Sequence, residues 1–457
     1  MNSQENSVSL VRQLGLVSAT ALVVSNMIGT LIFGGTGFLV GQLGSVHLVL
    51  GIYVVGALCA LAGAFCYSEL GVNFPSSGGE YVYLTRAYGP TWGFMTGWVS
   101  FFAGFSGPIA ASALVFSEYL SYFWPALKGS NSQVFLGPFK FGGAQLCASG
   151  LVLVFTLLNL FGLKPVAAIQ NVLTSTKVAV IVGLILLGLL VGTGDWGHLS
   201  QSAVRTTDTP LSAQFAISLF WVYLAYSGWN AATYVAEEIH QPAKVLPVAL
   251  AAGTAIVAVL YFALNVMFFY STPPEGLKNQ MAIGSITASN LFGPAVSGIF
   301  TALMAVGLMS SVNAMVTIGP RVYYAMAKNG AFFKGAAYVS PTYRTPTNAV
   351  LWQGMTAMLM TLTPFPDLVL YISALLSFFS TVTVSTLFIF RKRPGWQKLP
   401  VVNFLFPVIP GFFMIVGVWM TLFGLTLEPK VTATAIGTVL VGALVYHFYI
   451  RKQGAVQ

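Results

Sequence analysis

Long apolar runs separated by short polar connections dominate this chain of 457 residues. A helix needs about 20 apolar residues to cross the hydrocarbon core of a bilayer. By this criterion the sequence predicts an all-α integral membrane protein with twelve transmembrane helices in one domain, residues 1–457. The predicted spans lie near 13–40, 46–73, 91–123, 143–162, 167–193, 213–238, 247–270, 291–325, 347–364, 367–390, 403–425 and 431–450.

Composition excludes a soluble protein. The chain is 56% hydrophobic and only 7% charged, whereas a soluble chain carries about 25% charged residues. The net charge of +9 is dispersed among short loops, so it indicates membrane topology and we expect no nucleic-acid partner. Cys59, Cys66 and Cys147 fall inside apolar segments, and no disulfide framework is predicted.

Basic residues orient the predicted spans, because cytoplasmic loops carry an excess of Lys and Arg. Twelve spans place both termini on one side, which we expect to be the cytoplasm. The loops then expected inside hold Arg12, Arg86, Lys164, Lys244, Arg321, Lys328, Lys334, Arg344, Arg391, Lys392, Arg393, Lys398, Arg451 and Lys452. Those expected outside hold Lys128, Lys140, Arg205, Lys278 and Lys430.

Two spans contain sequences typical of broken helices. The first carries Gly29 within residues 25–30, and the sixth carries Gly228 within residues 226–230. Irregular backbone at membrane depth persists only where it lines a cavity or is buried in protein. Interruptions five spans apart indicate an inverted five-plus-five repeat, with repeats at about 13–193 and 213–390 and two further helices at 403–450. For residues 34–37, close packing is the favoured interpretation of the glycines.

Broken helices expose backbone groups that suit a zwitterion. The half-helix beginning after Gly29 presents the amides of Thr30 and Leu31 to a carboxylate. Half-helix ends that present carbonyls would accept hydrogen bonds from an ammonium group. The predicted amine acceptors are Met27, Leu224, Ala225 and Ser227. This pattern predicts a binding site for an α-amino acid.

Lys177 is the only basic residue left inside a predicted span. A charged amine at that depth costs about 2.5–3.5 kcal/mol on insertion scales, so it marks a functional hypothesis. Three interpretations stay open. In the first, Lys177 acts as a fixed internal cation. In the second, it loads and releases a proton, which gives proton symport. In the third, it snorkels to an interface and has no function.

The sequence does not favour catalysis. The isolated residues His47, His198, His240 and His447 form no nucleophile–base set or metal cluster. We therefore expect no enzyme activity, no cofactor and no metal. A channel is a remoter alternative, because the two breaks differ in sequence and no repeated filter motif is present.

Together these residues resemble the amino acid–polyamine–organocation superfamily, most closely its L-type amino acid transporter branch and the bacterial serine/threonine exchanger relatives. The resemblance covers nearly the whole chain. The stretches that carry it are residues 28–30, 78–84, 225–230, Glu237-Glu238 with Pro242 and Leu246-Pro247, 344–346 and 391–393.

The resemblance implies a leucine-transporter-type fold with the substrate between spans one and six. It implies that Lys177 links span five to spans one and eight, with Ser310 and Ser311 as neighbours. It assigns Leu224 to the place of an aromatic gate and brings Ser380 near the extracellular gate. Apart from the resemblance, two interpretations of Trp229 stay open, a cavity wall and an interfacial or packing residue. This chain has Leu31 where the family pattern has a second glycine, which puts the substrate range in question.

The expected function is secondary transport of neutral L-amino acids by sodium-independent antiport, in a prokaryotic plasma membrane. Cationic substrates are less expected, because the sequence predicts no buried acidic residue that could bind a second positive charge. Glu69 and Glu118 lie at span ends, and we expect both side chains to be hydrated. Animal members of the L-type branch pair with a glycoprotein through a cysteine between spans three and four. The stretch Pro125–Gly142 has none, so no disulfide-linked heavy chain is expected.

Overall fold

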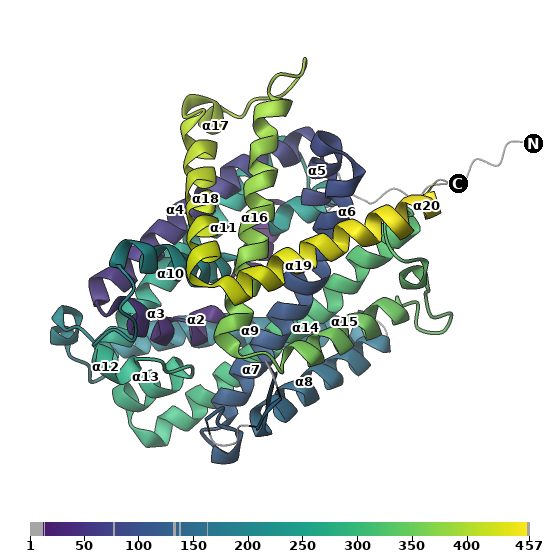
Figure 1. The fold of residues 1–457 in the computed structure, drawn as a ribbon. Coiled ribbons are helices and arrows are strands. Elements are labelled where there is room, and N and C mark those ends of the chain that lie inside the picture. The colour runs from purple at the N-terminus through teal and green to yellow at the C-terminus, as the bar shows by residue number, and fades with distance from the viewer. Residues whose placement is uncertain are drawn as a thin grey trace, which may run out of the picture.

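The computed structural model describes residue 12 and residues 14–75, 78–130, 134–136, 139–161 and 163–454. Residue 13, where the first predicted span begins, and residue 162, where the fourth ends, lie outside this range. The chain folds into one helical bundle (Figure 1). Its first helices, up to the predicted third span, are α1 (Leu16–Met27), α2 (Leu31–Gly34), α3 (Thr36–Leu43), α4 (Val46–Asn73), α5 (Glu80–Tyr88), α6 (Pro90–Val99), the π-helix η1 (Ser100–Ser106) and α7 (Gly107–Leu120).

The middle of the chain contains the only sheet among the described residues, an antiparallel pair of short strands. Its elements are the 3₁₀ helix η2 (Pro125–Leu127), β1 (Val134–Leu136), β2 (Phe139–Phe141), α8 (Gly143–Leu160), α9 (Leu163–Val191), the 3₁₀ helix η3 (Trp196–Ser200), α10 (Leu211–Tyr226) and the 3₁₀ helix η4 (Ala231–Glu238).

The remaining chain is helical. It comprises α11 (Pro242–Ser271), α12 (Pro274–Leu277), α13 (Ile283–Phe292), α14 (Pro294–Lys328), the 3₁₀ helix η5 (Lys334–Ala337), α15 (Thr347–Met360), α16 (Phe365–Phe390), α17 (Pro400–Phe404), α18 (Val408–Leu427), α19 (Pro429–Val445), the π-helix η6 (Tyr446–Ile450) and α20 (Arg451–Gly454).

Ten helical segments in the described part of the chain are long and apolar enough to cross a membrane. They fall on ten of the twelve predicted spans. The other two predicted spans coincide with α10 and α15, which have 16 and 14 residues. The structure therefore supports a multi-pass membrane protein, and the count of twelve spans stays a prediction.

Proline and glycine set several helix boundaries. Pro90, Pro242 and Pro294 occupy the first positions of α6, α11 and α14. The N–H that proline lacks would have no partner within the helix at this position, so its loss costs no hydrogen bond. Gly44 ends α3 in the left-handed conformation at φ 71°, which glycine adopts without a Cβ penalty. These residues thus mark the start of α6, α11 and α14 and the end of α3.

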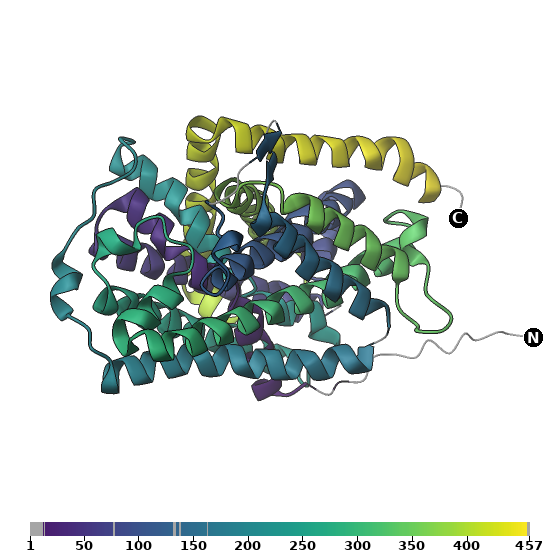
Figure 2. The ribbon, with the colours of Figure 1, turned by 90° about the horizontal axis from the view of Figure 1, so that it is seen from below.

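Helix α11 packs against both α1 and α4. In Figure 2, α9 lies along one face of the molecule and α19 (yellow) along the opposite face. Figure 1 places α5 and α17 near one end of the bundle and α12 and α13 near the other; we call these the α5–α17 end and the α12–α13 end. The broken segments after α1 and α10 lie between them.

Candidate functional site

The two helix breaks contact each other through backbone. Helix α1 ends at Met27 and α2 begins at Leu31, while α10 ends at Tyr226 and η4 begins at Ala231. Gly228, between α10 and η4, has φ 102°, and a Cβ there would lie 2.9 Å from the carbonyl atoms of Asn26. Glycine is required for both reasons, the positive φ and the close approach. The polar backbone groups of both breaks therefore share one region.

The first break supplies amide donors. Among the described residues, neither the Thr30 nor the Leu31 amide has a backbone carbonyl recorded as its acceptor. Both residues are buried, and the Thr30 hydroxyl forms a hydrogen bond with the Ser112 hydroxyl on α7. A Cβ at Gly29 would find its nearest neighbour at 3.7 Å. Gly29 therefore tolerates a methyl group, and the amides that follow it are available to a carboxylate.

The carbonyl side of the site is partly engaged within the protein. The Tyr261 hydroxyl, from α11, donates to the Met27 carbonyl at 2.6 Å and also faces the Gly29 amide. The Leu224 carbonyl accepts from the Ser227 amide at 3.1 Å. Tyr261 thus bridges the two ends of the first break. The sequence analysis missed it, because one tyrosine in an apolar helix carries no distinguishing pattern.

The glycines that follow the first break serve close packing, as predicted. A Cβ at Gly34 would lie 3.1 Å from the Val115 side chain on α7. A Cβ at Gly37 would lie 2.2 Å from the Gln280 carbonyl oxygen, in the segment after α12. These contacts tolerate no added methyl at Gly37, whereas Gly29 has space.

The Lys177 side chain reaches the first break. It is 3% exposed, and its ammonium donates to the Ile28 carbonyl at 2.6 Å and to the Ser25 carbonyl at 3.4 Å. Its aliphatic stem packs against Gly307 of α14, where a Cβ would approach it to 3.4 Å. The lysine therefore connects α9 with α1 and α14, the three helices that the resemblance links.

The predicted serine neighbours make different contacts. The Ser310 hydroxyl bonds to Thr174 and Gln170 of α9, each at 3.0 Å, and the recorded Lys177 bonds go to backbone carbonyls of the first span. The Ser311 hydroxyl is buried without a hydrogen-bond partner in the described part of the protein. Ser310 thus helps to join α9 to α14 beside the lysine, instead of contacting its ammonium.

A largely apolar cavity adjoins the second break. It lies between α4, α10, α16 and α18, and Trp229, Cys59, Tyr223, Thr381 and Phe413 are among its lining residues. The Trp229 ring packs edge-on against Tyr67 and Phe413, with centroids 4.7 and 6.0 Å apart. Trp229 thus lines a cavity between α4, α10, α16 and α18, and its role in walling a substrate site between spans one and six stays a prediction.

Leu224 and Ser380 differ in their surroundings. Leu224 is partly buried and packs against the apolar core. Ser380, on α16, accepts from the Tyr223 hydroxyl at 2.9 Å and donates to Glu80 at 3.4 Å. Glu80 follows the second span, on the side expected to be cytoplasmic. Ser380 therefore lies beside Glu80, and its place near the extracellular gate stays a prediction.

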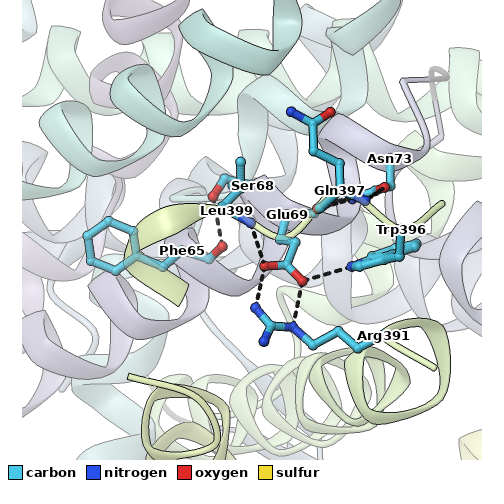
Figure 3. A network of polar contacts seen from close by, with 8 residues as sticks. All are labelled: Phe65, Ser68, Glu69, Asn73, Arg391, Trp396, Gln397 and Leu399. Carbon is cyan, nitrogen blue, oxygen red and sulfur yellow. Dashed lines mark hydrogen bonds and ion pairs between the residues drawn. The ribbon is translucent and has the colours of Figure 1, made fainter. Parts of the chain in front are cut away.

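Glu69 is buried in an ion pair, so the expectation of a hydrated side chain was wrong. The carboxylate is fully buried and accepts from Arg391 Nε and a terminal nitrogen at 2.7 and 2.6 Å. Figure 3 shows the same carboxylate meeting the Trp396 ring nitrogen and the Leu399 amide, at 2.8 and 3.1 Å. The Arg391 guanidinium also lies 4.1 Å from the Phe406 ring centroid.

This network joins segments that are far apart in the sequence. Glu69 belongs to α4, Arg391 follows α16, and Leu399 precedes α17 (Figure 3). A bidentate arginine–carboxylate pair fixes geometry, and removing one partner leaves an uncompensated buried charge. The network therefore fixes the end of α4 to the connection between α16 and α17, at the α5–α17 end.

Glu80 is a second buried acid, only 8% exposed. The expectation that the protein holds no buried acidic residue was therefore wrong for Glu69 and Glu80. That expectation was the reason given against cationic substrates, and the reason no longer stands.

Multiple membrane-length helices around two touching helix breaks define a multi-pass integral membrane protein. The family described as amino acid permease matches residues 14–446. The chain therefore belongs to the amino acid permease family, whose members are transporters. This confirms the resemblance to the amino acid–polyamine–organocation superfamily.

Named relatives agree with the family assignment. The chain is 28% identical to the rabbit (Oryctolagus cuniculus) large neutral amino acids transporter small subunit 2, over 99% of this chain and 83% of the relative. It is 26% identical to the mouse (Mus musculus) b(0,+)-type amino acid transporter 1, over 98% and 89%. It is 27% identical to the serine/threonine exchanger SteT of Bacillus subtilis, over 91% and 92%. The predicted branch and its bacterial relatives are thus both represented, and these relatives are transporters or exchangers of amino acids.

Proposed function

We propose that this protein exchanges neutral L-amino acids across a prokaryotic plasma membrane, without sodium, by alternating access. The observation that carries the proposal is the backbone contact between the two breaks at Gly228 and Asn26. It brings the available Thr30 and Leu31 amides near the carbonyl-rich end of α10. Amide donors beside carbonyl acceptors bind a zwitterion without requiring a charged side chain.

The proposed binding roles follow from these groups. The amides of Thr30 and Leu31, together with Gly29, take the substrate carboxylate. The carbonyls of Met27, Leu224, Ala225 and Ser227 take the amine, with Tyr261 sharing the Met27 carbonyl. Leu224 and Trp229 bound the space for the substrate side chain.

Lys177 is the proposed internal cation. Its two hydrogen bonds to first-span carbonyls support a role in which a fixed ammonium holds α9 to α1 and takes the place of a coupling ion. Proton-coupled symport through Lys177 is the alternative. A channel is remoter, since family and named relatives are transporters and exchangers.

The proposed topology has twelve spans, a five-plus-five inverted repeat and both termini in the cytoplasm. In this scheme the α5–α17 end faces the cytoplasm, because Lys244 and the basic run 391–398 lie there in sequence. Spans one, two, six and seven rock against the other helices. We propose that the protein works without a disulfide-linked heavy chain.

Purified protein in liposomes tests the function directly. Uptake of radiolabelled neutral amino acids is measured with internal substrate, sodium and pH varied independently. The proposal expects saturable uptake that internal amino acid stimulates and sodium leaves unchanged. Uptake that needs no internal substrate and follows an imposed proton gradient would favour symport, and non-saturable flux would favour a channel.

A further inference from the structure

Glu80 begins α5 and accepts hydrogen bonds from three other parts of the bundle. The Tyr67 hydroxyl on α4 donates to its Oε1 atom at 2.6 Å. The Asn230 side chain, between α10 and η4, donates at 3.4 Å, and the Ser380 hydroxyl on α16 donates at 3.4 Å. One carboxyl oxygen thus links the second span, the second helix break and α16.

In the described part of the chain, the titratable groups that face Glu80 are tyrosines. They are Tyr67 on α4, Tyr83 on α5, Tyr223 on α10 and Tyr234 on η4, and α16 contributes the Ser380 hydroxyl. Among the described residues, no lysine, arginine or histidine is recorded as an electrostatic partner of Glu80. Glu69, in contrast, has Arg391. The burial of Glu80 is therefore not balanced by a cation.

Two physical effects oppose each other at this carboxyl. Burial raises the pKa of Glu80 because it penalises the charged form, and the hydroxyl donors Tyr67 and Ser380 lower it by a smaller amount. If α4, the segment around Asn230 and α16 separate, water replaces the protein around Glu80 and the penalty disappears. The closed arrangement therefore binds a proton more tightly than an open one does.

We propose that Glu80 is a proton-binding site that controls opening of the bundle at the α5–α17 end. The inference rests on the proposed function, since it needs a protein that alternates between closed and open arrangements. Protonated Glu80 stays buried against Tyr67, Asn230 and Ser380 and favours closure. Deprotonated Glu80 favours hydration and opening, so exchange speeds up as pH rises on the side that this end faces.

The test is the pH profile of amino acid exchange in proteoliposomes, with wild type, Glu80→Gln and Glu118→Gln compared. Glutamine keeps the shape and hydrogen-bonding capacity of a neutral carboxyl but binds no proton. We expect wild-type exchange to rise at least about threefold between pH 5.5 and 8.0, as a group with a state-dependent pKa requires. Glu80→Gln should match wild type at acidic pH and stay flat. Glu118, at the end of α7, accepts from the Gly129 amide and lies outside this network, so Glu118→Gln should keep the wild-type slope.

A second pair of variants guards against a folding defect in Glu80→Gln. Tyr67→Phe and Ser380→Ala each remove a donor that favours the ionised carboxyl, so each should move the midpoint of the profile to higher pH. A uniform loss of rate at every pH, or a wild-type slope in Glu80→Gln, would overturn the proposal. So would uptake of lysine or arginine that requires Glu80 and lacks a pH slope, which would assign Glu80 to a cationic substrate. If the wild-type protein shows no exchange at any pH, that result overturns the proposed function itself, and the proposed role of Glu80 falls with it.

Discussion

The Lys177 ammonium donates a hydrogen bond of 2.6 Å to the Ile28 carbonyl oxygen, at the point where the first span is interrupted. Ile28 follows the last residue of α1, so its carbonyl accepts no hydrogen bond from an amide of that helix. The lysine supplies the missing donor, and the carbonyl supplies an acceptor for a buried charge. Each group explains why the other is tolerated inside an apolar bundle.

Replacing Lys177 by methionine should remove most transport. The change keeps much of the stem that packs on Gly307 but deletes the bonds to Ile28 and Ser25. Hydrogen bonds to charged groups contribute about 1.5–3 kcal/mol, so we expect exchange to fall roughly 10- to 100-fold. Proteoliposome exchange measures the loss. Lys244→Met, at an exposed lysine of α11, is the matched control and should retain activity. Wild-type exchange by Lys177→Met would establish the snorkelling interpretation.

Two glycines of the first span should respond differently to alanine. Gly29 has space for a methyl group, whereas a Cβ at Gly37 would clash with backbone oxygen atoms. Gly29→Ala should therefore leave the melting temperature close to that of wild type and raise the KM for exchange, because the methyl occupies the approach to the Thr30 and Leu31 amides. Gly37→Ala should lower the melting temperature, since overpacking costs about 1–3 kcal/mol. A destabilised Gly29→Ala with normal KM would reverse this assignment.

Breaking the buried ion pair should destabilise the protein. Arg391→Met leaves the Glu69 carboxylate buried without its cation, and such losses cost about 3–5 kcal/mol. Unfolding in detergent should show a clear fall in melting temperature. Replacing both partners by apolar residues should recover part of it. The pair of half-buried Lys278 and exposed Glu275 offers a comparison, and Lys278→Met should change the melting temperature little. Equal changes in melting temperature for Arg391→Met and Lys278→Met would show that the buried Glu69 network stabilises the protein no more than this surface pair does.

Tyr261→Phe should weaken substrate binding without unfolding the bundle. The variant keeps the ring and removes the donor to the Met27 carbonyl. One hydrogen bond contributes about 0.5–1.5 kcal/mol, so KM should change by roughly 2- to 10-fold. Tyr270 lies on the same helix, and its hydroxyl makes a long hydrogen bond of 3.5 Å to the Gly192 carbonyl, so Tyr270→Phe serves as the control. Identical kinetics in both variants would remove Tyr261 from the site.

Stability should also report the burial of Glu80. Because its pKa is raised in the folded protein, the folded state binds the proton more tightly than the unfolded state does. The resulting stabilisation is fully present below the unfolded pKa and is lost as pH rises through the folded pKa. The melting temperature of wild type should therefore fall over this window relative to that of Glu80→Gln. Parallel melting curves for the two proteins across the window would contradict the burial argument.

Much of the fold could be predicted from hydrophobic length. The predicted second span, 46–73, coincides residue for residue with α4, and nine other predicted spans overlap helices of membrane length. The break at Gly29 and the buried position of Lys177 were also accessible, because a glycine or a charge inside an apolar run is visible in the sequence. The shortness of α10 and α15 was not, since apolar length alone does not locate the last helical hydrogen bond.

The missing parts of the site depend on contacts between distant residues. Glu69 and Arg391 lie 322 residues apart, and each by itself looks like a hydrated residue at a span end. Glu80 lies in a polar segment, where its burial under Tyr67 and Ser380 leaves no mark on periodicity. Ser310 was expected as a neighbour of Lys177, and the sequence does not say that its hydroxyl bonds to Thr174 and Gln170, on the same helix as Lys177.

The most direct test of the central claim is a density map of the protein with a bound neutral amino acid. The proposal requires the carboxylate to lie within hydrogen-bond reach of the Thr30 and Leu31 amides and the amine to face the carbonyls at the end of α10. Substrate bound elsewhere, for example wholly inside the cavity walled by Trp229 and Phe413, or helices running unbroken past Gly29 and Gly228, would contradict it.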